Sequence, residues 1–272
     1  MTRDVAPAHN ALKARLARGQ VAVSLIVRSA RGPEIALVAR SSGFDALYID
    51  LEHSPLSLDT ASMLCIASQA AGVTPLVRVP EASAAWISRV LDGGAMGVIV
   101  PHVEDAAAAR AAVALAKYPP QGRRSVSTTL PQLAYRPLPA AEAHGLLNRE
   151  TLVAAMIESG RGLRHADEIA AVEGIDMLLV GAGDLAADLG VAGPSAQAAL
   201  RGAFDTVIAA CRRHGKTAGA GGLAGQLDLL AEVVAAGVRY VSAGTDTGFL
   251  LAGAQARVAA IRARCPPGAD GP

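Results

Sequence analysis

Asp45-Ala-Leu-Tyr-Ile-Asp50-Leu-Glu-His53-Ser-Pro55 is an apolar run that ends in three ionisable side chains within four positions. Residues 45–50 are typical of a short buried strand, and Pro55 cannot continue a β-ladder. We therefore expect the three ionisable side chains on the loop that follows this strand. Such loops often carry the chemistry of an enzyme, but the cluster is also compatible with a purely structural role.

Strand and helix signals alternate along the whole chain. Strand-like apolar runs occupy residues 21–27, 45–50, 74–80, 97–101, 152–157, 176–180, 216–219 and 239–242. Helix-like stretches separate them, and the one over residues 58–71 is expected to stop at Gly72. Strands alternating with helices form parallel βαβ units, and eight such units predict an α/β fold, the (β/α)8 TIM barrel. A doubly wound open sheet is the alternative.

The expected domain takes up nearly the whole chain. A single barrel should occupy residues 1–265, and the Pro/Gly-rich stretch 266–272 should be a disordered tail. Residues 118–150 interrupt the alternation with five prolines, which predicts a long loop with one short helix. A loop of this length inside a domain is either functional or disordered.

Composition argues against several classes of protein. Of 272 residues, 51% are hydrophobic and 18% are charged, and the net charge is +1, so we expect neither nucleic-acid nor membrane binding. The three cysteines lie far apart without metal-ligand spacing. The chain start lacks the apolar run of a signal peptide, and no run approaches transmembrane length. We therefore expect a soluble, cytoplasmic protein.

Charged residues stand at the ends of several predicted strands. In a (β/α)8 barrel, active sites lie at the C-terminal ends of the strands, where the following loops share one face. The residues expected there are Asp50, Glu52, His53, Arg78, Glu158 and Asp184. This convergence predicts an enzyme.

Glu158 and Asp184 follow the fifth and sixth strands, which are neighbours in a barrel, so both carboxylates are expected to face one point. Two hard oxygen ligands, completed by water and substrate oxygens, suit Mg²⁺ or Mn²⁺. The structural alternative pairs one carboxylate with an arginine and uses Asp184 to cap a helix that starts at residue 185. Spacing alone leaves both interpretations open.

Arg78 and His53 are the other candidates for chemistry. The Arg78 guanidinium is suited to a carboxylate or enolate oxygen or, alternatively, to one of the acidic residues after the second strand. His53 is a candidate general base near neutral pH, oriented by Asp50 or Asp92. The other histidines are presumed to be only hydrogen-bonded, and His102 is the most promising exception.

Six motifs follow one another along residues 20–255. They are Asp45-Ala-Leu-Tyr-Ile-Asp-Leu-Glu-His-Ser-Pro55, Pro75-Leu-Val-Arg-Val-Pro80, Leu91-Asp-Gly-Gly-Ala95, Lys117-Tyr-Pro-Pro-Gln-Gly122, Met156-Ile-Glu158 and Gly181-Ala-Gly-Asp-Leu-Ala186. In this order and spacing the chain resembles the HpcH/HpaI aldolase family, class II metal-dependent pyruvate aldolases that act on 2-dehydro-3-deoxy-sugar acids or 4-hydroxy-2-oxo acids.

The resemblance implies a phosphoenolpyruvate/pyruvate-type barrel in which Glu158 and Asp184 hold a divalent metal, Mg²⁺, Mn²⁺ or Co²⁺. The metal would chelate the carboxylate and keto oxygens of a 2-oxo acid such as pyruvate or oxaloacetate. Arg78 would stabilise the enolate oxygen, and His53, with Asp50 near it, would serve the proton transfers. The second substrate would be an aldehyde or acyl acceptor.

The resemblance also implies features beyond this metal centre. Backbone N–H groups around Ala182, Gly183 and Asp184 would hold the substrate carboxylate, and Asp92 would reach the site of a neighbouring subunit. Such enzymes are similar in being homohexamers, trimers of dimers that exchange the last helix. Here that helix is expected over residues 246–262.

Three stretches depart from the family pattern. Gly122-Arg-Arg-Ser125-Val-Ser127 stands in place of Gly-x-Arg-Gly-x-Gly, Met156 in place of glutamine, and the loop Ala218-Gly-Ala-Gly-Gly222 is unusually bare. All three are expected to border the acceptor pocket or the oxo-acid site. Our first hypothesis is a metal-dependent carbon–carbon lyase. The second is an oxaloacetate-using decarboxylase or citrate-synthase-like condensing enzyme, and the third is a catalytically silent barrel that binds a small 2-oxo acid or acts as an assembly subunit.

Overall fold

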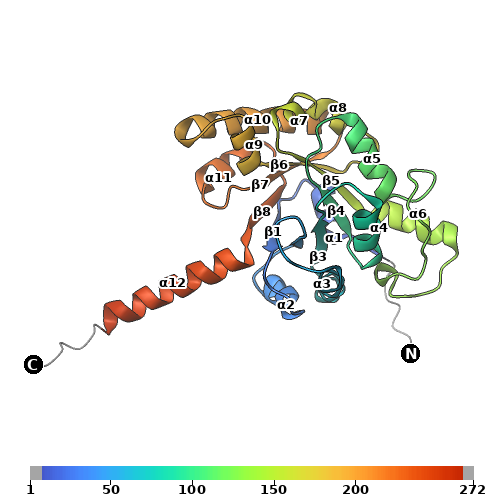
Figure 1. Cartoon of the computed structure of the whole chain (residues 1–272), viewed down its shortest axis with the longest axis horizontal. Coiled ribbons are helices and arrows are strands. Elements are labelled where there is room, and N and C mark those ends of the chain that lie inside the picture. The colour runs from blue at the N-terminus through green and yellow to red at the C-terminus, as the bar shows by residue number, and fades with distance from the viewer. Residues whose placement is uncertain (1–7, 266–272) are drawn as a thin grey trace, which may run out of the picture.

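Eight parallel strands form a closed barrel in the computed structural model, which describes residues 8–265 (Figure 1). The strands are β1 (Ala22–Val27), β2 (Ala46–Asp50), β3 (Thr74–Arg78), β4 (Gly97–Val100), β5 (Leu152–Ile157), β6 (Met177–Gly181), β7 (Thr217–Gly221) and β8 (Tyr240–Thr245). Each strand pairs with the next along the chain, and β1 pairs with β8, which closes the sheet. The predicted (β/α)8 barrel is confirmed, and the open-sheet alternative is wrong.

Helices surround the barrel (Figure 1). They are α1 (Ala11–Ala17), α2 (Glu34–Ser41), α3 (Leu58–Ala71), α4 (Ala84–Asp92), α5 (Ala106–Ala116), α6 (Ala140–Glu150), α7 (Gly160–Arg164), α8 (Ala166–Ala170), α9 (Ala182–Asp188), α10 (Gly193–Arg213), α11 (Leu227–Ala236) and α12 (Asp246–Arg264). The predicted end of α3 is confirmed. Gly72 ends this helix at φ 74°, a left-handed conformation that glycine adopts without strain.

Side chains alternate along each strand between the helical layer and the barrel interior. On β2, Leu47 and Ile49 pack in the core under the helices, whereas Ala46 and Tyr48 belong to the interior core. The next position on the interior side is Asp50, at the end of the strand. The same period of two directs the last side chain of β3 and the first one after β5 toward the mouth of the barrel. Strand geometry therefore brings the predicted site together.

The segment 118–150 contains more regular structure than predicted. A 3₁₀ turn, η1 (Pro131–Leu133), and the eleven-residue helix α6 replace the single short helix. α6 is stabilised by tertiary packing, because its residues Ala143 and Leu147 form a separate core with Tyr118. The surrounding prolines dominated the local signal and concealed this helix.

Smaller differences concern the ends of elements. The helix predicted over residues 162–172 is two helices, α7 and α8, which meet at His165. β7 and β8 continue beyond their predicted ends to Gly221 and Thr245. These extensions bring a glycine-rich backbone to the mouth of the barrel.

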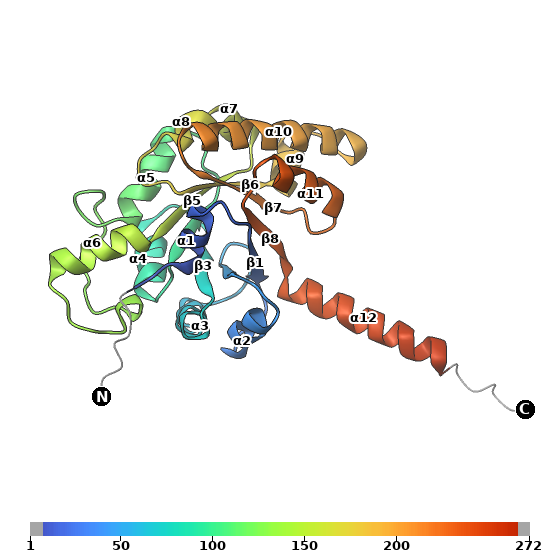
Figure 2. The ribbon, with the colours of Figure 1, turned by 180° about the vertical axis from the view of Figure 1, so that it is seen from behind.

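α12 projects away from the barrel (Figures 1 and 2), and none of its residues is buried. Its beginning is anchored, because the Asp246 carboxylate accepts backbone N–H groups of Arg28, Ser29 and Ala30 after β1. Phe249 adds a contact with Phe44, with ring centroids 6.0 Å apart, and nearly all residues of the helix beyond it are exposed.

Two further expectations concern the ends of the chain and membrane-spanning segments. The predicted tail 266–272 and the first seven residues of the predicted domain lie outside the described residues. Within the part that the structure describes, no helix combines the length and apolar character needed to cross a membrane.

Candidate active site

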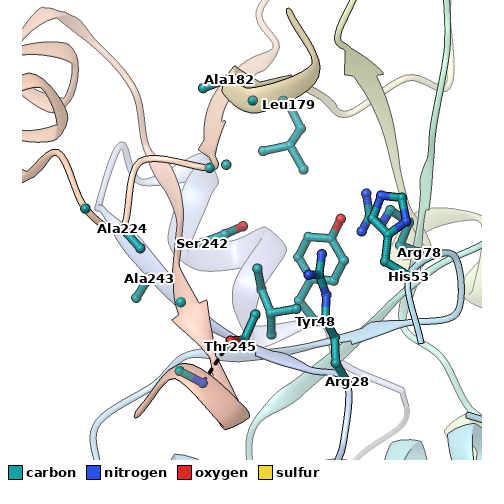
Figure 3. A pocket seen from close by; sticks show the side chains of 18 of the residues that line it. Arg28, Tyr48, His53, Arg78, Leu179, Ala182, Ala224, Ser242, Ala243 and Thr245 are labelled. Atoms are coloured by element: carbon teal, nitrogen blue, oxygen red, sulfur yellow. Dashed lines mark hydrogen bonds between the residues drawn. The ribbon is translucent and has the colours of Figure 1, made fainter. Parts of the chain in front are cut away.

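A cavity of 590 Å³ opens at the C-terminal ends of the strands. Its ionisable lining residues include Arg28, His53, Arg78 and Asp184, and Tyr48 reaches it from the barrel interior (Figure 3). Most of the remaining lining comes from glycine, alanine and other uncharged residues after β6, β7 and β8. The predicted face of the barrel is therefore the face that carries the cavity.

Asp50 joins two arginines at this cavity. Its Oδ1 accepts from Arg78 Nε at 2.9 Å, and its Oδ2 accepts from Arg78 Nη2 at 2.6 Å and from Arg28 Nε at 2.7 Å. Burial raises the pKa of Asp50, but the hydrogen bonds and charge of Arg78, with the hydrogen bond from Arg28, outweigh burial, so the pKa is lowered. Asp50 therefore stays ionised and fixes both guanidinium groups. The expected pairing of Arg78 with an acid after β2 is confirmed.

Glu52 and His102 extend these contacts to Glu158. Arg78 Nη1 lies 2.8 Å from Glu52 Oε2. The His102 ring lies between two carboxylates, with Nδ1 3.0 Å from Glu158 Oε1 and Nε2 3.3 Å from Glu52 Oε1. The His102 backbone N–H donates to the same Glu158 oxygen at 2.7 Å, and its φ of 52° is unusual for a residue with a side chain. We call the connected group Arg28, Asp50, Glu52, Arg78, His102 and Glu158 the charged network.

Glu158 lies in a concentration of negative charge. Burial raises its pKa, contacts with His102 lower it, and the charges of Glu52 and Asp184 raise it, so that the pKa is raised overall. Gly181 leaves room for this carboxylate, because a Cβ there would lie 3.0 Å from Glu158 Oε2. Gly181 also lines the cavity, which places Glu158 immediately behind the cavity surface.

Asp184 is exposed at the cavity on the first turn of α9, without a hydrogen-bond partner among residues 8–265. The cap alternative is wrong, because the N-cap of α9 is Gly181. The arginine alternative is wrong for Glu158, which pairs with His102.

The two carboxylates fit a hard divalent cation such as Mg²⁺ or Mn²⁺, because they supply oxygen donors in a region of excess negative charge. Within the described residues, no group of three or more His, Cys, Asp or Glu side chains could hold a metal ion by itself. Substrate and solvent oxygens would therefore have to complete the coordination of a cation held by Glu158 and Asp184.

His53 lines the cavity with half of its side chain exposed, and its Nε2 is 3.9 Å from Glu52 Oε2. Asp50 accepts the backbone N–H of His53 rather than a ring nitrogen. Asp92 ends α4, pairs with the buried Arg124 at 2.6 Å, and does not line the cavity. The expectation that Asp50 or Asp92 orients the His53 ring within one subunit is therefore wrong, because arginines already hold both carboxylates.

Two of the three unusual stretches border the site. Gly221 and Gly222 line the cavity, and Met156 lines it with its sulfur 3.8 Å from the Tyr48 hydroxyl oxygen. The stretch 122–127 does not line the cavity of this chain, so that expectation is wrong within one subunit. Ala182, Gly183 and Asp184 line the cavity as expected, and their role in holding a carboxylate stays a prediction.

Sequence reasoning missed two features of the cavity. Arg28 directly follows β1, and applying the strand-end argument to that strand would have found it. The second feature is a surface without charge, which we call the bare wall and define as Gly221, Gly222, Ala243 and Gly244. Its extent depends on how far β7 and β8 continue, which the weak strand signals did not indicate.

Known proteins resemble this chain in both amino-acid sequence and architecture. Residues 24–252 match the HpcH/HpaI aldolase/citrate lyase family. The 4-hydroxy-4-methyl-2-oxoglutarate aldolase tasA of Hapsidospora irregularis is 41% identical over 264 residues, which cover 94% of this chain and 98% of that protein. A crystal structure of an HpcH/HpaI aldolase from Desulfitobacterium hafniense DCB-2 has a TM-score of 0.86 at 29% identity, covering 96% of this chain and 99% of the other. The structure of the citrate synthase SbnG has a TM-score of 0.83 at 32% identity, with coverages of 94% and 99%.

Proposed function

This chain belongs to the HpcH/HpaI aldolase/citrate lyase family, and from that premise we propose that its cavity cleaves and forms 4-hydroxy-2-oxo acids through an enolate of pyruvate. The protein is a carbon–carbon lyase of the aldolase type. One observation carries the assignment of the site: Arg78 and Asp184 line the cavity together with Gly181, which leaves the buried carboxylate of Glu158 directly behind the cavity surface. The carboxylates that could hold a cation and the permanently charged guanidinium of Arg78 thus lie at the same cavity.

A divalent cation held by Glu158 and Asp184 would polarise the 2-oxo group of the substrate and stabilise negative charge on its oxygen. Arg78 adds a positive charge that needs no rearrangement during the reaction, because Asp50 and Glu52 already hold its guanidinium. The second N–H of its Nη2 has no acceptor among residues 8–265 and is suited to donate to the oxygen on which charge develops.

His53 is the side chain proposed to move protons. In the cleavage direction its ring would accept the proton of the C4 hydroxyl as the C3–C4 bond breaks, and in synthesis it would return that proton. Its half-exposed ring at the cavity is compatible with this role. Backbone N–H groups of Ala182, Gly183 and Asp184 are proposed to hold the substrate carboxylate.

The experiment that tests the metal–enolate site of this function measures oxaloacetate consumption and pyruvate release, with and without Mn²⁺, for the wild type and Glu158→Gln, because decarboxylation and aldol cleavage form the same enolate. Glutamine preserves the shape but removes the charge, so we expect metal-dependent turnover to fall at least about 100-fold. Mn²⁺ binding, followed by electron paramagnetic resonance, should weaken in parallel. Glu232→Gln is the matched control, because Glu232 pairs with Arg201 on the exposed surface. Wild-type turnover that survives EDTA, or Glu158→Gln turnover equal to that of the control, would sink the proposed metal site.

A second candidate is an oxaloacetate-using decarboxylase or condensing enzyme. The likeness to the citrate synthase SbnG over nearly the whole chain favours it, since both reactions need a stabilised enolate. An assay for thiol release from acetyl-CoA and oxaloacetate identifies the condensing enzyme, because neither aldol cleavage nor decarboxylation releases a thiol. Thiol release that exceeds pyruvate release would favour the condensing enzyme.

We also propose that the chain forms a homohexamer, a trimer of dimers that exchanges α12. Exposed apolar side chains such as Leu250 and Leu251 lie on α12, and an apolar cavity of 650 Å³ beside its first turn is lined partly by α2. Light scattering should report a hexamer for the wild type and smaller species for a Leu250→Glu, Leu251→Glu variant. Asp92 is proposed to reach a neighbouring site only in such an assembly. A cytoplasmic location stays a prediction of the sequence.

A further inference from the structure

Arg28 is a cavity residue to which the proposed chemistry assigns no role. Its backbone N–H donates to Asp246 Oδ1 at 3.2 Å, and its Nε donates to Asp50 Oδ2 at 2.7 Å. Main chain and side chain are therefore both anchored. The guanidinium is held at the cavity, which Tyr48 also lines (Figure 3).

The two arginines that share Asp50 differ in their remaining hydrogen-bonding capacity. The Arg78 side chain is 5% exposed and directs Nε and one N–H of Nη2 to Asp50, and Nη1 to Glu52 and to the Met156 sulfur, which leaves one N–H of Nη2. The Arg28 side chain is 36% exposed, and among residues 8–265 no group accepts from its two Nη atoms. Arg28 therefore keeps the outer edge of its guanidinium available, and that edge has the geometry to bind a carboxylate through two hydrogen bonds.

Arg28 is the less compensated of the two arginines, because its side chain pairs with one carboxylate, that of Asp50, which it shares with Arg78. Arg78 is compensated by the two carboxylates it contacts, and Asp184 is assigned to the cation. The bare wall contributes no charge of its own. Because Asp50 already orders the Arg28 side chain, binding an anion there requires little further loss of side-chain freedom.

We propose that Arg28 binds the carboxylate of the acceptor half of the substrate, which selects 4-hydroxy-2-oxo acids that carry a carboxylate on C4. This assignment rests on the proposed aldolase function and adds the substrate class. In cleavage, the C3–C4 bond breaks, its electron pair stays on the pyruvate half as the enolate, and the C4 hydroxyl proton passes to His53. C4 becomes the keto carbon of a second 2-oxo acid, whose carboxylate remains on Arg28. Protonation of C3 completes pyruvate, so the reaction needs no further reactant.

The test compares two substrates that differ at C4. One is 4-hydroxy-4-methyl-2-oxoglutarate, and the other is 4-hydroxy-2-oxopentanoate, which has no carboxylate on that carbon. We expect the wild type to favour the first, and Arg28→Met to lower the ratio of the two kcat/KM values for pyruvate release by about 10- to 100-fold. Arg28→Lys keeps the charge and should restore part of the ratio. Arg31→Met is the matched control, because Arg31 is exposed on the same loop.

Each outcome bears on the role of Arg28. If both kcat/KM values fall together in Arg28→Met and the ratio stays within about twofold of the wild-type ratio, Arg28 only positions Asp50 and the assignment is overturned. Thermal unfolding shows whether each variant is folded. If Arg28→Met does not fold, Arg28→Lys carries the test, because an ammonium cannot replace the bidentate fork and must still lower the ratio.

Deuterium exchange at the methyl group of pyruvate, followed by NMR, separates this proposal from the function on which it rests. Exchange needs an enolate but no acceptor. A wild type that exchanges deuterium but does not discriminate between the two substrates overturns the role of Arg28 alone. A wild type without exchange overturns the proposed function, and the role of Arg28 falls with it.

Discussion

The charged network and the bare wall surround one cavity but are built by opposite means. The charged network holds its members by ion pairs and hydrogen bonds, with Asp50 shared by two arginines and Glu158 contacted by both the ring and the backbone of His102. The bare wall consists of strand ends and loops whose residues have little or no side chain, such as Gly222. On one side the side chains are abundant and mutually fixed, and on the other they are nearly absent.

This difference separates two requirements of an active site. Charges that stabilise a reaction must be oriented before it begins, and a network of neighbouring charges provides that orientation. Space for a substrate is obtained most directly by omitting side chains from the opposite surface. Activity and stability should therefore be sensitive to replacements in the charged network that remove charge at constant shape. At the glycines that line the cavity next to this network, function should instead be sensitive to an added methyl group.

The largest effect is expected at the centre of the charged network. Asp50→Asn keeps the shape of the side chain but leaves the buried Arg78 without its main counter-charge. We expect the free energy of unfolding, measured with urea, to fall by about 3–5 kcal/mol, and pyruvate release to be lost. Asp167→Asn is the comparison, because Asp167 pairs with Arg213 and His214 at the surface, and it should change stability far less. Equal losses in the two variants would refute the view that burial makes this network critical.

A smaller effect is expected where the glycine-lined surface meets Glu158. In Gly181→Ala the new Cβ would lie 3.0 Å from Glu158 Oε2 and 3.2 Å from Met156 Cε, so the carboxylate must shift. We expect the affinity for Mn²⁺, measured by calorimetry, to fall about 10- to 100-fold. Gly183→Ala is the control, because its added Cβ would have no atom within 4 Å apart from its chain neighbours and the backbone of its own helix. Wild-type affinity in both variants would mean that the space at Gly181 is not needed for the metal.

The smallest effect is expected at Asp246, which joins β1 to α12. Burial raises its pKa, but backbone N–H donors from Ala30, Ser29 and Arg28 outweigh burial, and the pKa is lowered. Ionised Asp246 therefore stabilises the folded state fully above the unfolded-state pKa of about 4, and this stabilisation is lost as the pH falls through the folded-state pKa.

Acidification should accordingly reduce the free energy of unfolding more in the wild type than in Asp246→Asn. We expect the difference to stay below about 1 kcal/mol, since solvent screens this partly exposed group. Asp50 has a lowered pKa in both proteins, so its contribution cancels in the comparison. Parallel stability curves from urea titrations between neutral and acid pH would contradict the prediction.

The charged network was largely predictable from sequence, because its members stand at strand ends. Asp50, Arg78 and Glu158 each follow or end an apolar run, and parallel strands in a barrel bring such positions to one face. Their partners were less predictable. The sequence offered Asp92 as a partner for His53, whereas the structure pairs Asp92 with Arg124. Pairing depends on distance and burial in three dimensions, which residue order does not specify.

The bare wall was harder to recognise. Its glycines carry no side-chain chemistry, and the short strand signals of β7 and β8 ended before the residues that line the cavity. Tertiary context extends these strands, because β7 pairs with β6 as far as Gly221 and β8 pairs with β1 as far as Thr245 in the closed sheet. The same context stabilises α6, which prolines had concealed.

The sequence by itself determined the eight-stranded barrel, the face that carries the cavity and most of the ionisable groups at it. These follow from hydrophobic periodicity and from glycine and proline signals, which act over a few residues. Only the tertiary structure decided that Asp50 is shared by Arg28 and Arg78, that His102 lies between Glu52 and Glu158, and that Arg28 keeps an edge available to the cavity. The physical reason is that ion pairs and hydrogen bonds act over a few ångströms between groups that lie far apart in the chain.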